Sequence, residues 1–429
     1  MRKAPVFIIF LTVFIDLLGF GMIVPLLSRY ATSYGATAFQ AGLLVASYSL
    51  AQFVFAPIWG HVSDRVGRKP ILALTLAGNA LSYAVYALAK DLTVLFVART
   101  MSGVFAANIS TAQAYVADVT TPENRAKGMG MIGMAFGLGF VLGPAMGGPL
   151  GKYVGIWAPG AAAALLSTIA CVVCVLKLEE SVTPELRAKA QRRAGHPIMD
   201  LRKALGRKEI AGLLGFFFFL GFGFANLESM APLFLRDRFG FDEAQTGYVF
   251  AYIGVCLAFA QGFLIGRLAK KHGEANILRV APWLIAVGLQ LYWLAPNLWV
   301  YLLVVPVVAI GMGLSNPCVA TLISRRTPPD IQGRTLGLSQ SLGALARALS
   351  PGLAGWLYGR YPTPDLVRPI YAETVAKEVS VVPLIWGGAS IAFGIFLARK
   401  CLRIVTPTPT VTATVPPGGA LEVTVPPLD

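Results

Sequence analysis

Charged residues are scarce in this chain, and their scarcity excludes an ordinary soluble protein. Only 13% of the 429 residues are Asp, Glu, Lys or Arg, whereas 56% are hydrophobic and the mean hydropathy is +0.66. A soluble domain carries about 25% charged residues and needs no such apolar excess. We therefore expect the chain to lie in a lipid bilayer, with lipid as its most extensive partner.

The sequence also lacks the motifs of most catalytic and metal-binding proteins. Its five cysteines have no recurring spacing, so no disulfide framework is predicted, and the C-x-x-C formed by Cys171 and Cys174 falls inside an apolar run. No Walker loop, H-E-x-x-H motif or serine elbow occurs, and the three histidines lie in polar loops. Neither an enzyme nor a resident metal or cofactor is predicted.

Long apolar runs recur along almost the whole chain. Each is long enough to cross about 30 Å of hydrocarbon at about 1.5 Å per residue. Helices are predicted, because a segment in lipid must satisfy its own backbone hydrogen bonds and these runs show no strand alternation. The expected fold is an all-α integral membrane protein with twelve transmembrane helices, at residues 5–27, 38–59, 70–89, 92–115, 128–150, 155–176, 210–235, 244–268, 277–294, 298–323, 335–357 and 381–402.

The two halves of the chain repeat one another. Pro25 and Pro232, like Gly148 and Gly355, are separated by 207 positions. Because six spans lie between equivalent positions, the halves are predicted to be parallel repeats related by an axis along the membrane normal. The expected domains are an N-terminal six-helix bundle (1–176), a basic cytoplasmic linker (177–208), a C-terminal six-helix bundle (209–405) and a disordered tail rich in Pro, Thr and Val (406–429).

The placement of the basic residues predicts an orientation. The net charge of +15 is scattered over short loops and forms no continuous basic face, so binding to nucleic acid is not expected. Most Lys and Arg fall on one side of the predicted spans if the amino terminus is cytoplasmic, which is the positive-inside pattern. We expect a multi-pass protein of the cell (inner) membrane, with both termini in the cytoplasm, that acts as a monomer.

The loop between the second and third spans contains Gly60, Asp64, Arg65, Gly67 and Arg68. A solvated turn that obeys the positive-inside pattern would explain the basic residues, but neither the aspartate nor the glycines. The loop resembles the signature G-x-x-x-D-R-x-G-R-K that the major facilitator superfamily carries between these same two spans.

Two further segments narrow the resemblance. The first span is similar to that of proton-coupled drug exporters, including the tetracycline exporters. The fifth span resembles the antiporter signature G-x-x-x-G-P-x-x-G-G through Gly139, Gly143, Pro144, Gly147 and Gly148. On these motifs the chain is identified as a member of the superfamily, similar to its drug:proton antiporters over residues 6–403.

The resemblance implies a cytoplasmic gate. In the family, the loop aspartate and second arginine form a charge relay with an acid at the end of span four, and Asp64, Arg68 and Asp118 match these positions, with Arg125 nearby. Such a cluster biases a conformational equilibrium by a few kcal/mol without touching substrate. In the second half, Lys270 and Glu274 stand where Asp64 and Arg68 stand in the first, so that copy is expected to have degenerated.

The resemblance also gives the fifth span a part in the interface between the halves. Small residues at five of its positions leave two faces bare, and close helix packing is the simpler interpretation of the same glycines. Both interpretations can hold.

Four ionisable side chains lie deep in the spans: Asp16, Arg99, Glu228 and Arg347. Each costs about 2.5–3.5 kcal/mol to insert, so we expect them to face a cavity or one another. Asp16 and Arg99 lie at similar depths, within reach of a pair, and Glu228 and Arg347 are candidates for a second pair. Arg99 also fits the family's R-x-x-x-G motif, which the resemblance links to proton coupling.

These residues predict a proton-coupled transporter. A buried carboxyl exchanges its proton when hydration or a nearby arginine changes, and competition between proton and substrate for one carboxylate produces antiport. The alternative role for Asp16 and Arg99 is a permanent pair that only holds helices together. The four charges sum to zero, so neither anions nor cations are favoured as substrates.

The predicted function is therefore proton-coupled secondary active transport by alternating access, as an antiporter that exports lipophilic drugs or metabolites. Proton-linked transport of an amphipathic lipid, sugar or other nutrient is one alternative, and a non-transporting membrane receptor is another. The expected substrate is a small lipophilic or amphipathic molecule, and protons are the coupling ion. Aromatic and polar residues that could line its cavity are Gln52, Asn108, Gln113, Phe224, Asn226, Tyr252, Gln261, Asn316 and Gln340.

Overall fold

The computed structural model describes residues 3–23, 26–36, 38–106, 108–192, 208–241, 243–360 and 382–403. Within these ranges the protein is helical and contains no strand. The predicted tail at 406–429, and residues 193–207 of the predicted linker, lie outside the described residues.

The first half consists of eight α-helices, one of which continues into a single π-helical turn, η2. In chain order they are α1 (Lys3–Ile23), α2 (Leu27–Ser33), α3 (Ala38–Val66), α4 (Arg68–Ala87), α5 (Leu92–Val104), α6 (Asn108–Val119), α7 (Pro122–Pro149), η2 (Leu150–Val154) and α8 (Ala158–Lys177). A short helix, α9 (Pro184–Arg192), follows within the predicted linker.

The second half has a similar sequence of long helices. They are α11 (Lys208–Phe239), α12 (Glu243–Phe259), the π-helical η3 (Ala260–Leu264), α13 (Ile265–His272), α14 (Glu274–Leu294), α15 (Leu298–Arg325), the 3-10 turn η4 (Pro329–Ile331), α16 (Gln332–Arg360) and α19 (Val382–Arg403).

The predicted spans all fall on helices. In the described ranges, nine helical stretches are long and apolar enough to cross a membrane, and α3, α16 and α19 occupy the second, eleventh and twelfth predicted spans. The fourth span differs from the prediction, because a turn at Phe105 and Ala106 divides it into α5 and α6. The all-helical membrane fold is thereby confirmed, while the count of twelve crossings stays a prediction.

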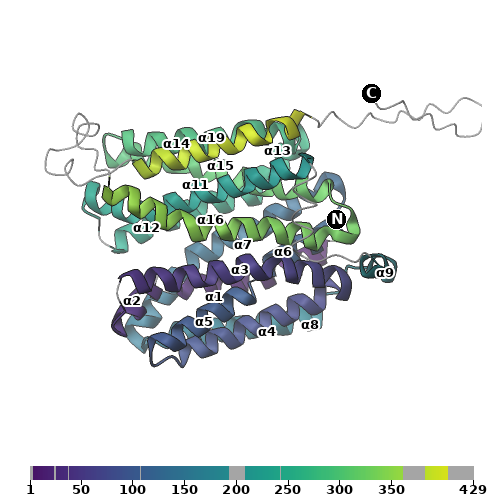
Figure 1. Ribbon diagram of the computed structural model, residues 1–429, viewed down its shortest axis with the longest axis horizontal. Helices are drawn as coiled ribbons and strands as arrows, with labels where there is room; N and C mark the ends of the chain where they lie inside the picture. The colour runs from purple at the N-terminus through teal and green to yellow at the C-terminus, as the bar shows by residue number, and fades with distance from the viewer. Residues whose placement is uncertain are drawn as a thin grey trace, which may run out of the picture.

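The helices run side by side along the long axis of the molecule, with the first half on one side and the second half on the other (Figure 1). The halves meet where α3 packs against α16 and where α7 packs against α12 and α13. We call the end where α3 finishes and α16 begins the gate end. At this end α9 contacts both α3 and η4.

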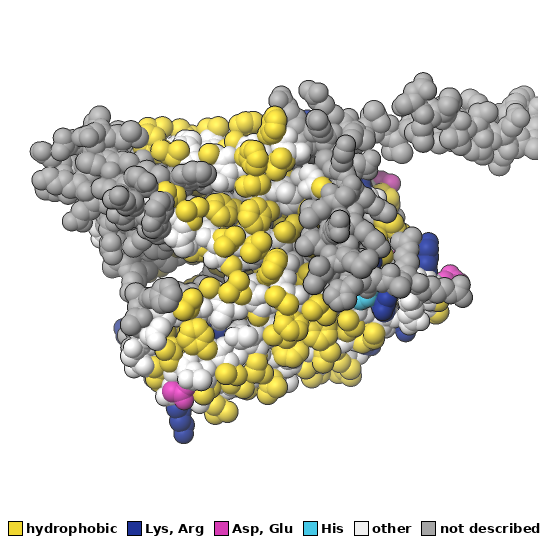
Figure 2. All heavy atoms as spheres, viewed as in Figure 1, with side chains coloured by type: hydrophobic (Ala, Val, Ile, Leu, Met, Phe, Trp, Pro, Cys, Tyr) yellow, Lys and Arg dark blue, Asp and Glu magenta, His cyan; other side chains and the backbone are white. Residues whose placement is uncertain are grey.

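Apolar side chains cover much of the outer surface between the two ends (Figure 2). Leu81 of α4 is 57% exposed, Leu165 of α8 62% and Leu303 of α15 73%. Side chains of this kind gain nothing from exposure to water but are suited to hydrocarbon. The exposed leucines therefore mark the lipid-facing side of their helices.

Glycines allow the halves to touch at the gate end. A Cβ added to Gly60 of α3 would overlap the carbonyl oxygen of Gly333 in α16, and one added to Gly337 would lie 2.6 Å from the carbonyl oxygen of Ala56. The α3 and α16 backbones are thus in direct contact, which only residues without side chains permit.

The close backbone contacts between the halves lie toward the gate end. On the α7 face that meets α12, Gly137 lies 3.1 Å from the Gly254 carbonyl oxygen, measured from the position of an added Cβ. Further from the gate end, Gly148 of α7, Gly247 of α12 and Gly352 of α16 have no atom within 4 Å of that position. These three glycines therefore form no close contact of the kind seen at Gly60 and Gly337.

Candidate functional site

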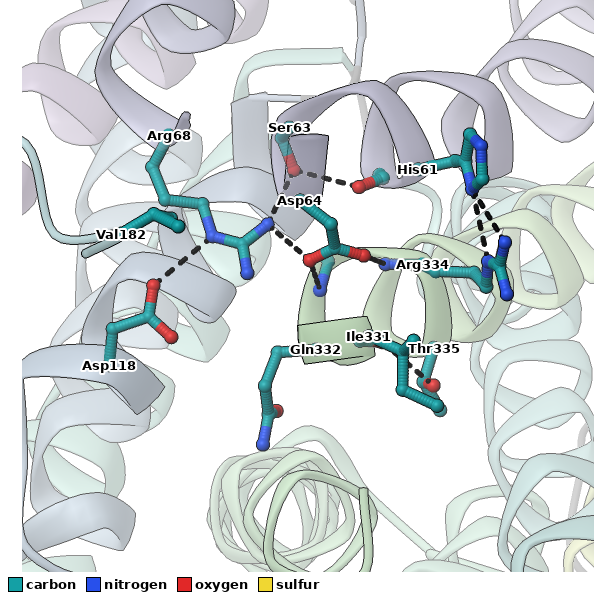
Figure 3. A network of polar contacts seen from close by, with 12 residues as sticks. His61, Ser63, Asp64, Arg68, Asp118, Val182, Ile331, Gln332, Arg334 and Thr335 are labelled. Atoms are coloured by element: carbon teal, nitrogen blue, oxygen red, sulfur yellow. Dashed lines mark hydrogen bonds and ion pairs between the residues drawn. The ribbon is translucent and has the colours of Figure 1, made fainter. Parts of the chain in front are cut away.

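The gate loop and the end of the fourth span form a buried charge cluster (Figure 3). Arg68, only 1% exposed, lies 2.6 Å from Asp64 and 3.1 Å from Asp118, and its Nη1 donates a hydrogen bond to Ser63. A buried guanidinium needs acceptors for several N–H groups, and two carboxylates and a hydroxyl supply them here. The structure therefore brings together the three residues of the predicted relay.

The carboxylate of Asp64 also reaches across to the other half. Its two oxygens accept hydrogen bonds of 2.8 Å from the backbone N–H groups of Gly333 and Arg334, in the first turn of α16. These N–H groups have no partner within their own helix, and a negative charge is favoured at this end of a helix. Burial raises the pKa of Asp64, whereas Arg68 and the two backbone donors oppose that rise. One side chain of the first half thus caps a helix of the second.

The start of the linker is bound into the same cluster. Glu180 accepts hydrogen bonds from the backbone N–H groups of Arg68, at 2.9 Å, and Lys69, at 3.2 Å, and so caps α4. Its neighbour Ser181 donates to Asp118 at 2.8 Å. The linker is therefore an integral part of the gate and does more than connect the two halves.

The other predicted gate residues shape the backbone around the charge cluster or link neighbouring helices. Gly67, between α3 and α4, has φ of +123°, a region that favours glycine. Arg65 offers its carbonyl oxygen to Gln191 of α9 at 3.3 Å. Arg125 donates to the carbonyl oxygen of Ala117 at 2.9 Å. Arg125 thereby fastens α7 to the end of α6.

The second half retains a charge pair at the equivalent place, with the charges exchanged. Arg325 of α15 lies 2.9 Å from Glu274 of α14, and it also donates to the carbonyl oxygen of Pro122 in the first half. In the repeat, Glu274 corresponds to Arg68 and Arg325 to Asp118. The expectation that this copy has degenerated is therefore wrong for Glu274, whose change is matched by the opposite change at its partner. It holds for Lys270, an exposed residue that stands in place of the buried acid Asp64.

Asp16 is enclosed by neutral donors within the first half. Its carboxylate, 3% exposed, accepts hydrogen bonds from Asn79 of α4 at 3.3 and 3.4 Å, from Ser167 of α8 at 3.0 Å and from Asn108 of α6. It forms no ion pair with Arg99, so the predicted pair is wrong. Residue counting gives the height of a side chain along its helix but not the direction in which it points around that helix.

Arg99 is a buried cation that lies against aromatic rings. Its side chain is 2% exposed, and its guanidinium carbon lies 4.7 Å from the ring centre of Tyr48 and 5.8 Å from that of Phe20. Its Nε and Nη1 atoms are buried and have no hydrogen-bond partner. Ring faces attract the charge but provide no acceptor in the plane of the guanidinium.

Arg347 joins the halves near the same place. Its Nη2 donates to Oε1 of Gln52 at 2.9 Å, and the Nε2 of Gln52 donates to the carbonyl oxygen of Ala106 at 3.2 Å. Glu228 lies on α11, but its side chain is outside the described residues. The predicted pair of Glu228 and Arg347 therefore stays a prediction.

Like Gln52, three more of the predicted cavity residues lie where the halves meet. Gln340 donates to Gln113 at 3.3 Å across the interface, and Gln261 of η3 packs against Gly133 of α7. Asn226 is fully buried in α11, while Asn316 is half-buried and Tyr252 is 39% exposed. These residues therefore do not converge on one site.

A small cavity between the halves, about 30 Å³ in volume, is lined by apolar residues. Phe224 is the one predicted substrate residue in its wall, which is formed by Phe136, Phe140, Phe224, Leu227, Ala231, Phe250, Ile253, Gly254 and Leu257 of α7, α11 and α12. This cavity offers a surface for an apolar body and no polar recognition.

The glycines of α7 serve two contacts. Gly139, Gly143 and Gly147 face α1, where added Cβ atoms would crowd Leu17, Gly21 and Met22, whereas Gly133 and Gly137 face the second half. The segment is thus closely packed on two faces, as predicted, but the signature glycines face their own half. Pro144 lies within α7, and Gly148 is in open space.

Two of the three partners of Asp16, Asn79 and Ser167, were not among the predicted site residues. Both are polar residues within apolar spans, the same signal that identified Asn108 as a candidate. Glu180 and Arg334 at the gate end were not predicted either, because the sequence offers no signal for them beyond their charge.

Comparison with known proteins agrees with this architecture. The sequence model of the Major Facilitator Superfamily matches residues 9–351. The chain is 31% identical to the class C tetracycline resistance protein of Escherichia coli, over 91% of this chain and 93% of that protein. It is 30% identical to the human major facilitator superfamily domain-containing protein 10, over 83% of this chain and 88% of that protein.

A solved structure gives the same result. The crystal structure of the human organic anion transporter MFSD10 (TETRAN) superposes with a TM-score of 0.75 at 26% identity, covering 92% of this chain and 99% of that one. With the matched sequence model, the long helices and the relatives' near-complete coverage, the chain belongs to the major facilitator superfamily and is a multi-pass membrane transporter related to the tetracycline efflux proteins.

Proposed function

We propose that the protein is a proton-coupled antiporter that exports lipophilic drugs or metabolites by alternating access. In this proposal it crosses the cell membrane twelve times, with the gate end and both termini on the cytoplasmic side. The described conformation then corresponds to a state closed toward the cytoplasm and opening outward. Protons are the coupling ion, and no other cofactor is required.

The observation that carries the proposal is the environment of Asp16. A carboxylate deep in a membrane span, surrounded by Asn79, Asn108 and Ser167 and by no described cation within ion-pair distance, is held in the described part of the chain by neutral hydrogen bonds alone. Its negative charge therefore has little compensation, and binding a proton removes that cost. A group of this kind gains and loses a proton as water enters and leaves its surroundings.

The contact between Asp64 and α16 supplies the conformational part of the mechanism. It exists only while the halves touch at the gate end, so every event that separates Asp64 from Gly333 and Arg334 must replace two charged hydrogen bonds. A closed gate is thereby stabilised independently of substrate. The names of its relatives, tetracycline resistance proteins and an organic anion transporter, agree with small organic substrates.

The test uses vesicles that contain the purified protein, an acidic interior and a fluorescent pH indicator. Addition of tetracycline or of an aromatic organic acid outside should produce accumulation of that compound together with a rise in internal pH. Asp16→Asn should abolish accumulation driven by the pH gradient while it preserves exchange of labelled for unlabelled compound. Glu179→Gln, which neutralises an exposed acid, is the matched control. Full gradient-driven accumulation by Asp16→Asn would exclude Asp16 as the proton carrier.

A further inference from the structure

Arg99 is a buried charge whose partner is absent from the described residues. Its Nε and Nη1 atoms are buried with no acceptor, and the aromatic rings of Tyr48 and Phe20 cover faces of the guanidinium without accepting its in-plane N–H groups. Buried cations in proteins are paired as a rule. An unpaired one within a transporter's core indicates a binding partner that comes and goes.

Asp16, the predicted ion-pair partner of Arg99, is already hydrogen-bonded to other residues. Asp16 accepts four hydrogen bonds from Asn79, Asn108 and Ser167, and leaves Arg99 without an ion pair. The expectation that Arg99 pairs with Asp16 therefore does not hold. An incoming ligand finds a cation with free donors and a carboxylate whose oxygens are occupied.

A second arginine contacts the same part of α3. Tyr48 and Gln52 are one turn apart on α3. Arg99 lies over the ring of Tyr48, and Arg347 of the other half donates to Gln52. One arginine from each half thus faces the same turn of α3.

We propose that this arginine and aromatic site, formed by Arg99, Tyr48, Gln52 and Arg347, binds the anionic group of the substrate. The substrate class is then an amphipathic organic anion, in which a carboxylate or similar group is joined to an aromatic or aliphatic body. The carboxylate fills the unoccupied N–H positions of Arg99, and the body rests on Tyr48 and Phe20. This inference deepens the proposed function and rests on the chain being a transporter, but not on Asp16 carrying the proton.

The position of the site between the halves links binding to movement. Because Arg99 belongs to the first half and Arg347 to the second, an anion that contacts both is held best when the halves are correctly aligned.

The test measures equilibrium binding of three compounds with one ring system to the purified full-length protein. They are 1-naphthoate, the neutral 1-naphthamide and the cationic 1-naphthylmethylammonium, each titrated by calorimetry at neutral pH. Because hydrogen bonds to a charged acceptor are the stronger kind, naphthoate should bind about tenfold or more tightly than naphthamide, and the cation most weakly. Arg99→Gln should bring naphthoate and naphthamide to nearly equal affinity.

Three variants make the result decisive. Arg99→Lys keeps the charge and should preserve part of the preference, and Arg267→Gln, which removes an exposed arginine of α13, should leave it unchanged. Asp16→Asn should keep or increase the preference for naphthoate, even though it abolishes gradient-driven accumulation. If proton coupling fails for the wild type but the preference survives, the proposed coupling is wrong and the anion site stands.

Several outcomes would overturn the inference. Equal affinity of naphthoate and naphthamide for the wild type is one, and an unchanged preference in Arg99→Gln is another. Absence of naphthoate binding at millimolar concentration is a third. Loss of the preference in Asp16→Asn would show that the acid, and not Arg99, creates the selectivity.

Discussion

Neutralising Asp64 should shift the protein toward a state that is open at the gate end. Asp64→Asn removes the charge that accepts two 2.8 Å hydrogen bonds from Gly333 and Arg334. Hydrogen bonds to a charged group contribute about 1.5–3 kcal/mol each, and the asparagine oxygen can still accept one of them as a neutral bond. The pairing with Arg68 lies within one half and is present whether the gate is open or closed, so it largely cancels.

The expected net loss in the closed state is about 2 kcal/mol, which multiplies the ratio of open to closed molecules by about 30. Spin labels on Lys69→Cys in the first half and Lys271→Cys in the second, with the native cysteines replaced, report that ratio as a distance distribution. Both positions lie at the gate end and belong to different halves.

Asp118→Asn is the control, because Asp118 bonds to Arg68 and Ser181 in the first half and linker and forms no hydrogen bond or ion pair with the described residues of α16. It should leave the distance distribution close to that of the wild type. If Asp64→Asn leaves the distribution unchanged, or if both variants open the gate equally, the capping of α16 by Asp64 does not hold the gate closed.

Two further predictions concern the same end of the molecule. Gly60→Ala places a methyl group against the carbonyl oxygen of Gly333 and should open the gate in the spin-label experiment. Gly352→Ala places its methyl group in open space and should leave the gate closed. Equal effects of the two variants would refute the steric argument. Glu274→Arg should lower the melting temperature in detergent, and addition of Arg325→Glu should restore most of it, since a partly exposed pair couples by about 1 kcal/mol. No recovery in the double variant would mean that the two charges are not coupled.

The parts of the site that depend on local sequence could be predicted, and those that depend on the packing of the halves could not. Asp64, Arg68 and Asp118 were identified because a loop motif and a helix end specify their neighbourhood. The capping of α16 by Asp64 could not be predicted, because Asp64 and Gly333 are 269 residues apart in the sequence and only the packing of the halves brings them together. No pattern in the sequence specifies how closely α3 and α16 approach one another.

The pairing of Asp16 with Arg99 failed for a geometric reason. Counting 1.5 Å per residue gives height along a helix, and it placed both residues at comparable depth. Whether they meet depends on rotation about the helix axis, and Asp16 faces Asn79, Asn108 and Ser167. The end of α5 at Val104 and the start of α6 at Asn108 could not be predicted either, because the apolar run is continuous there.

A molecule that binds helix α9 from the aqueous phase should inhibit transport. It touches α3 of one half and η4 of the other, and Gln191 within it bonds to the α3 carbonyl of Arg65. Any binder that stiffened this bridge, such as an antibody fragment raised against residues 184–192, would clamp the two bundles together and arrest the cycle without entering the membrane. A short polar helix beyond the apolar spans thus gives an inhibitor a binding site from which it can block the movement of the membrane-embedded halves.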